Sequence, residues 1–122
     1  MADEITVSLS VSASKTGSGS FSSPRISFQA DMAESNLVGG ATQDIGFAAS
    51  ELVTFGDITA IPALVVIQNL DTTNYIEVGG DSGLTVFKMK VVAGEALAVR
   101  PTSTTLYCKA TVASVRIQKW VA

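Results

Sequence analysis

Oxygen-bearing side chains gather in the segment "NLDTTNYIEVGGDSG", which begins at residue 69. Asp71, Asn74, Glu77 and Asp81 offer hard oxygen ligands of the kind that calcium prefers. Their spacing does not follow the EF-hand pattern, however, and Glu77 falls inside an apolar–polar alternation that is typical of a strand. The segment therefore does not predict a metal site.

A short strand between two tight turns accounts for the same segment more simply. Asn and Asp side chains close turns by hydrogen bonding to their own backbone, and Gly adopts positive φ at little cost. A phosphate-binding loop would need a helix after the glycines and a Lys beside them, and neither is present. We interpret these residues as structural turn residues: Asn69, Asp71, Asn74, Gly79 and Gly83.

No catalytic arrangement can be assembled from the remaining residues. The chain has no His, so the commonest general base and the Ser-His and Cys-His arrangements are missing. The single Cys, Cys108 in "LYCKA", lies in a strand pattern and is interpreted as a small buried hydrophobe. Paired carboxylates can cleave glycosides, but no spacing brings together any two of Glu51, Asp57, Glu77 and Glu95. We predict a protein without enzymatic activity, catalytic residues, metal or cofactor.

Charge and hydropathy exclude two further classes of partner. The chain has 122 residues, a net charge of −3 and scattered basic residues, whereas phosphate-backbone binding needs a clustered basic face. Mean hydropathy is +0.38, yet no apolar run approaches the roughly 18 residues of a membrane span, and the start "MADEITVSLS" does not resemble a signal peptide. Charged residues make up 16% of the chain, against about 25% in ordinary domains. This low charge favours a surface that is covered by other copies of the chain.

The first third of the chain alternates apolar and polar residues. The period-two pattern of residues 5–14, "ITVSLSVSAS", predicts one long strand, and the segment "KTGSGS" at 15–20 predicts a flexible loop. A second alternating run, "RISFQADMA", begins at residue 25. We expect a long hairpin, or two strands of a larger all-β fold. Residues 1–14 are predicted to form an interface arm, with these interface residues: Ile5, Val7, Leu9 and, at the other end of the chain, Trp120.

The rest of the chain reads as short strands separated by turn residues. The segment 44–57, "DIGFAASELVTFGD", has both helical and alternating spacing, and we predict two short strands broken near Ser50. "PALVVIQNL" predicts a central strand that is buried on both faces, and the last strand places Val115, Ile117, Lys119 and Val121 on one side. We expect a single all-β domain over residues 1–122: a β-sandwich or jelly roll of about eight short antiparallel strands.

Several segments together resemble a family of small all-β virion proteins encoded by tailed bacteriophages. They are "VIQNLDTTNYIEVGGDSG", "FKMKVVAGEALAVRP" and "TLYCKATVASVRIQKW", with "TQDIG" and "LVTFGDI" upstream. The likeness covers about residues 42–120, and the order and spacing of the segments carry it. The resemblance implies a structural protein, with Asn69, Asp71 and Asn74 fixing the turn before the short strand. It implies further turns at Gly79 and Gly83 and at Gly94-Glu95, and a core strand with Leu106, Tyr107 and Ala110.

The resemblance implies a non-enzymatic structural component of a tailed-phage virion. We expect a capsid decoration or cement protein that assembles as a homo-oligomer, with a trimer favoured, and contacts the major capsid protein or another virion protein. It would be made in the cytoplasm of the bacterial host and located in the virion. A tail- or baseplate-associated subunit is one alternative. The other is a β-sandwich that binds host-surface carbohydrate, with these candidate residues: Trp120, Tyr75, Tyr107, Asn74 and Asp81.

Overall fold

The computed structural model describes residues 4–17, 19–85 and 87–122, and these residues form strands and loops without a helix. The strands are β1 Ile5–Leu9, β2 Ser12–Lys15, β3 Gly19–Ser22, β4 Ile26–Ala30, β5 Val38–Ile45, β6 Glu51–Leu52, β7 Val65–Asn69, β8 Ile76–Gly79, β9 Lys88–Val91, β10 Ala96–Val99, β11 Tyr107–Ala110 and β12 Val115–Val121. The chain was expected to be a single domain over 1–122, but it divides into two compact units, 1–32 and 33–122. The arm therefore extends beyond residue 14, because the returning strands pair with it.

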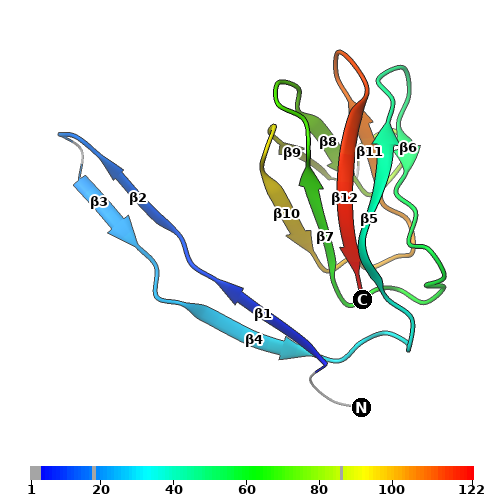
Figure 1. The fold of residues 1–122 in the computed structure, drawn as a ribbon, viewed down its shortest axis with the longest axis horizontal. Helices are drawn as coiled ribbons and strands as arrows, with labels where there is room; N and C mark the ends of the chain where they lie inside the picture. The colour runs from blue at the N-terminus through cyan, green and yellow to red at the C-terminus, as the bar shows by residue number, and fades with distance from the viewer. Residues whose placement is uncertain (1–3, 18, 86) are drawn as a thin grey trace. The chain divides into compact units, whose positions relative to one another are not determined.

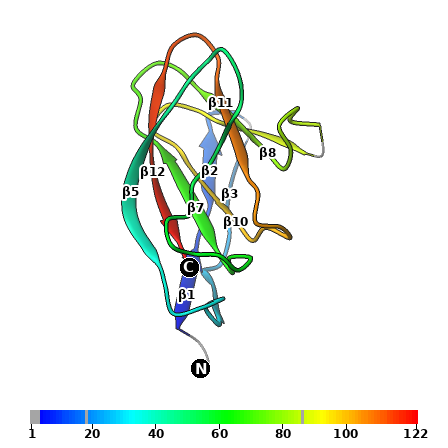
Figure 2. The ribbon, with the colours of Figure 1, turned by 90° about the vertical axis from the view of Figure 1, so that its right-hand side faces the viewer.

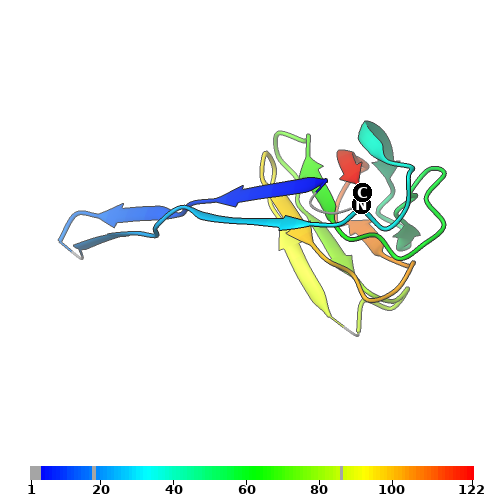
Figure 3. The same ribbon diagram turned by 90° about the horizontal axis from the view of Figure 1, so that it is seen from below.

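The first unit is a long antiparallel hairpin, as one of the two interpretations predicted (Figures 1 and 3). β1 pairs with β4, and β2 pairs with β3 nearer the turn. Between the two ladders, the backbone N–H of Ser23 donates to the carbonyl of Val11 at 2.7 Å, and the Ser23 hydroxyl accepts from Val11 N–H at 2.9 Å. The predicted continuous strand over 5–14 is thus interrupted between Leu9 and Ser12, but hydrogen bonds join its two parts to the same partner strand.

The flexible loop expected at 15–20 is shorter than predicted. Ser14 pairs with Ser20 and Lys15 pairs with Gly19, so three of these residues belong to the β2–β3 ladder. Gly17 and Gly19 have φ angles of 81° and 95°, which allow the chain to reverse tightly. Residue 18 lies outside the described residues. Glycine permits a tight reversal as readily as a flexible loop, and composition alone did not distinguish them.

The second unit is a two-layer β-sandwich (Figures 1 and 2). Sheet I has the strand order β10-β7-β12-β5, and sheet II has the order β6-β11-β8-β9. All these pairings are antiparallel. The eight strands of this unit match the predicted sandwich of about eight short antiparallel strands, and the all-β class is confirmed.

The hydrophobic core lies between the two sheets and comes entirely from the second unit. Along β12 the buried and less buried residues alternate strictly, which confirms the predicted inward set of Val115, Ile117, Lys119 and Val121. β7 was expected to be buried on both faces, but its outward residues Val66 and Gln68 are only half-buried. The members of the core are Ile45, Val53, Phe55, Ile58, Val65, Ile67, Ile76, Val78, Val91, Leu106, Cys108, Ala110, Val115, Ile117 and Val121.

The ambiguous segment 44–57 contains a break before Glu51, as predicted, but the first of its two predicted strands is only the end of the longer β5. β5 ends at Ile45, and β6 begins at Glu51 and pairs with β11. The Glu51 carboxylate accepts a hydrogen bond from the backbone N–H of Gly46, which closes the loop between the two strands. Neither the helical spacing nor the alternation of Ile45, Phe47 and Ala49 describes residues 46–50, which form a loop.

Lys119 is a buried cation on the inward side of β12, 3% exposed. Its Nζ donates to the Gln43 side-chain oxygen at 2.8 Å and also to the Thr54 hydroxyl. No described carboxylate forms an ion pair with it. Burial lowers the pKa of Lys119 below its usual value of 10.5, because a buried ammonium loses hydration.

We predict that Lys119→Met removes a pH dependence from the stability of the sandwich. Because the pKa of Lys119 is lower in the folded chain, the unfolded chain binds more protons between the folded-state pKa and 10.5. The free energy of unfolding of the parent protein should therefore rise with pH across this window, relative to the Met variant. Urea unfolding at a series of pH values up to 10.5 measures the difference between the two slopes. Parallel slopes would contradict the assignment.

Candidate assembly surface

The hairpin has one apolar face and one polar face. In the β1–β4 ladder, the apolar pairs are Ile5 with Ala30, Val7 with Phe28, and Leu9 with Ile26. The pairs between them are Thr6 with Gln29 and Ser8 with Ser27. Since successive residues of a strand point to opposite sides, the first set lies on one face and the second set on the other. Of the predicted interface residues, the structure brings Ile5, Val7 and Leu9 together on the apolar face.

Much of this apolar face is exposed. The exposed fractions are 46% for Leu9, 48% for Phe28 and 63% for Phe21, while Val7 is half-buried and Ile5 is buried. Exposed hydrophobic residues that stand alone are common, whereas a continuous apolar stripe marks a surface that binds something. A two-stranded ribbon is also marginally stable by itself in water. The hairpin therefore has a face that a partner would stabilise.

The apolar face continues toward the turn because the returning strand contains one extra residue. Leu9 pairs with Ile26, and the next regular pair is Ser12 with Ser22. Between these two pairs the first strand covers three residue steps, while the returning strand covers four. A bulge of this kind shifts the side-chain phase by one position. As a result, Phe21, which pairs with Ala13, stays in phase with the even-numbered residues of β4. The extra residue falls near Pro24, which lacks a backbone donor.

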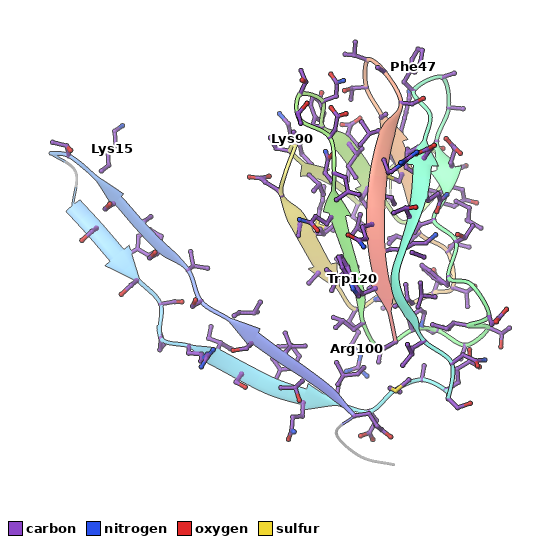
Figure 4. The ribbon with its side chains drawn as sticks, viewed as in Figure 1. Lys15, Phe47, Lys90, Arg100 and Trp120 are labelled. Atoms are coloured by element: carbon purple, nitrogen blue, oxygen red, sulfur yellow. The ribbon has the colours of Figure 1, made fainter. Side chains whose placement is uncertain are left out.

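The fourth predicted interface residue, Trp120, lies in the other unit on the outer face of sheet I (Figure 4). It pairs with Val66 of β7, which in turn pairs with Ala98 of β10. The next row on the same face runs Ala96, Gln68, Gln118 and Thr42 across the four strands. Trp120 is 38% exposed, and a hollow of about 200 Å³ beside it is lined mainly by apolar groups, including those of Leu37 and Leu64.

The charged residues of this outer face neutralise each other at one end. Arg116 Nε and Asp44 Oδ1 lie 2.9 Å apart in neighbouring strands. The hydrogen bond and the positive charge of Arg116 lower the pKa of the Asp44 carboxyl. Both side chains are well exposed, so this pair adds little stability. Because the two opposite charges are paired, they add no net charge to the outer face of sheet I.

The turn around Asn69 is held by two side chains. Asn69 is fully buried, and its Nδ2 donates to the carbonyls of Asn74 at 2.9 Å and Val91 at 3.0 Å. Its Oδ1 accepts from the N–H of Asp71 at 2.8 Å. The Asp71 carboxylate accepts from the N–H groups of Thr73 and Asn74, and these bonds lower its pKa. Asn74 enters these bonds through its main chain.

The predicted turn glycines have different roles. Gly79 cannot take a side chain, because an added Cβ would lie 2.6 Å from the backbone oxygen of Phe87. Positive φ in this region belongs instead to Leu84, at 54°, while Gly83 has ordinary contacts. Gly94 has a φ of 82°, and its N–H donates to the carbonyl of Asn69 at 3.0 Å. Gly79 is thus required by close approach of the backbone and not by its own φ angle.

The candidate carbohydrate residues do not form one cluster. Trp120 lies in sheet I, whereas Tyr107 lies in sheet II. The Tyr75 ring is covered by Lys90 Nζ at 4.2 Å from its centroid. Asp81 accepts two hydrogen bonds from Thr85 at 2.6 Å each, and the Asn74 contacts described above belong to a turn. The expected aromatic and polar set is therefore divided between the two sheets.

The outer face of sheet II is charged. Glu77 of β8 lies between Lys109 of β11 and Lys90 of β9 in the strand register, and Lys88 Nζ is 3.4 Å from its carboxylate. An open hollow of about 420 Å³ is lined by Glu77, Lys88, Lys109 and the loops near Ser50 and Ser82. Three lysines thus face one carboxylate. The sequence did not predict this cluster, since pairing across the sheet brings its members together.

The carboxylates and the thiol that were weighed for catalysis lie in separate places. Glu51, Glu77 and Glu95 bind Gly46, Lys88 and the backbone of Val92 respectively. Cys108 is buried in the core, and burial raises the pKa of its thiol to about 12. Within residues 4–17, 19–85 and 87–122, no group of three acidic or thiol side chains could hold a metal ion.

Comparison with protein-family models, curated proteins and solved structures finds no match to this chain. The described part of the chain also contains no helix that is long and apolar enough to cross a membrane. The proposals below therefore depend on the residues, their geometry and the sequence resemblance.

We predict that Asn69→Ala lowers the free energy of unfolding by about 3 kcal/mol, because it leaves buried backbone groups without partners. Asn74→Ala is the matched control, since it keeps the main-chain groups that form the turn, and it should change stability by less than about 0.5 kcal/mol. Urea denaturation of both variants measures the difference. Equal losses would contradict the assignment of the turn bonds to Asn69.

Proposed function

We propose that this chain is a non-enzymatic structural component of a tailed-bacteriophage virion. Its specific role would be that of a decoration or cement protein on the capsid exterior, made in the host cytoplasm and assembled as a homo-oligomer, with a trimer favoured. The partner would be the major capsid protein or another virion protein. The resemblance of residues 42–120 to small phage virion proteins supports the location in a virion.

The observation that carries the proposal is the exposed apolar face of the hairpin. Leu9, Ile26 and Phe28 are each about half exposed, although they occupy adjacent positions of a continuous ladder. A protein that functions alone gains nothing from such a face, whereas an assembly subunit can bury it against a neighbour. The low charge of the chain, 16% of residues, supports the same conclusion, because charged residues are depleted at the centres of interfaces.

We predict that the purified protein is a closed oligomer and that the double variant Leu9→Ser/Phe28→Ser is a monomer. The substitutions remove apolar contact area from one face of the hairpin and leave the sandwich core unchanged. Light scattering on a size-exclusion column gives the mass of each protein. Ser8→Thr/Ser27→Thr changes the opposite face of the same ladder and should keep the oligomer. A parent protein that is monomeric at every concentration would contradict self-assembly.

The virion role requires a separate measurement. Antibodies against the chain should label purified particles of the encoding phage at regular positions on the head, which electron microscopy can show. Labelling of the tail or baseplate would support the alternative location. Particles without label would contradict a virion role, whatever the oligomeric state.

A further inference from the structure

The structure contains both an exposed apolar ribbon and a sheet face without net charge. We propose that the apolar face of the hairpin of one copy docks on the outer face of sheet I of a second copy. Each copy would donate one hairpin and receive one, so that the exchange closes a ring. This inference rests on the self-assembly part of the proposed function, and it specifies which two surfaces meet.

The acceptor face is suited to an apolar ribbon because docking there would bury few charged groups without partners. Its two central rows contain Ala98, Val66 and Trp120 in one row, and Ala96, Gln68, Gln118 and Thr42 in the next. None of these side chains is ionised, and the adjacent Arg116 and Asp44 are paired. Sheets pack face to face at about 10 Å, with side chains of both faces interdigitating. The half-exposed Trp120 and the apolar hollow beside it would receive part of the ribbon.

The outer face of sheet II would be a poor acceptor. Lys88, Lys90 and Lys109 surround the single carboxylate of Glu77. An apolar ribbon on this face would remove ammonium groups from water without supplying partners, and burial of an unpaired charge is costly. This difference in charge between the two outer faces decides between them.

The size of the hairpin matches reciprocal exchange better than a single contact. Eleven residue positions, from Ile5 to Lys15, span about 36 Å at about 3.3 Å each, and two strands are about 10 Å wide. One face then offers about 360 Å², well below the roughly 800 Å² per partner of a stable interface. In a pair of copies that exchange hairpins, both contacts belong to one interface, and each copy contributes about 700 Å². Exchange within a pair therefore approaches the usual size of an interface, whereas a larger ring keeps about 360 Å² per partner at each contact.

The test uses two full-length variants, each with one added cysteine, that are co-expressed with different tags. Leu9→Cys marks the apolar face of the hairpin, and Ala98→Cys marks the acceptor face. Cys108 is buried, and the pKa of its thiol is raised to about 12, so it should not react. After purification by both tags, a bifunctional maleimide with a reach of about 10 Å should join the two variants. Denaturing electrophoresis and mass spectrometry identify the product.

Matched controls place the cysteine on the wrong face. Ser8→Cys lies next to position 9 but on the polar face of the hairpin, and Lys109→Cys lies on the outer face of sheet II. We expect the Leu9→Cys and Ala98→Cys combination to give severalfold more cross-linked heterodimer than either control combination. Trp120 is the single Trp of the chain, so its fluorescence supplies a second readout. Its emission should shift to the red in the Leu9→Ser/Phe28→Ser variant.

Three results would overturn the inference, and they differ in what they say about the proposed function. If the protein is oligomeric but cross-links equally well to position 109, the copies meet through another surface and self-assembly stands. If it is oligomeric and the Trp120 emission is unchanged in the double variant, the acceptor is not sheet I. If it is monomeric but labels virions, the hairpin binds a different virion protein.

Discussion

A two-stranded ribbon is a single layer, so the side chains on its faces cannot bury one another. The hairpin of this chain obeys that constraint: its strands pair with each other through their facing backbone groups, but Leu9, Phe21 and Phe28 remain exposed. The sandwich solves the same problem by facing two sheets, with all core residues between them. The chain thus combines a buried core in the sandwich with an exposed apolar face on the hairpin. That exposed face is where we expect another protein surface to bind.

Hydrogen bonds from one buried side chain connect several strands at one end of the sandwich. Asn69 joins the end of β7 to the chain before β8 and to the end of β9 through three hydrogen bonds. Because its amide is fully buried, these bonds form in surroundings where an unpaired group would be costly. Both sheets are therefore coupled at one end of the core. A face of sheet I that is held in this way can serve as a fixed platform for a partner.

Much of the fold could be predicted from the sequence because side-chain alternation indicates strands. The all-β class, the inward side of β12 and a break near Ser50 followed from such patterns, but β5 did not, because Gly39 and Gly40 are typical of a turn. The division at residue 32 could not be predicted, because the pattern of "ISFQA" does not say whether its partner is local or distant. The lysine cluster around Glu77 could not be predicted either, since its residues come from β8, β9 and β11, which are separated in the sequence. Gly79 was predicted to lie in a turn, but it is the last residue of β8 and pairs with Tyr107 and Lys88. Close approach of the Phe87 backbone, which the sequence cannot reveal, leaves no room for a side chain there.

The bulge in β5 affects how the sandwich can grow. Gly39 pairs with Trp120 and Ala41 pairs with Lys119, so Gly40, with a φ of 89°, is an extra residue in an edge strand. Irregular edges resist the addition of further strands, and so do the lysines of β9 and the brevity of β6, which are the two edge strands of sheet II. Polymerisation through these sheet edges is thereby discouraged at the high concentrations that particle assembly requires. Association through faces can then end at a finite size, while fibre formation is suppressed.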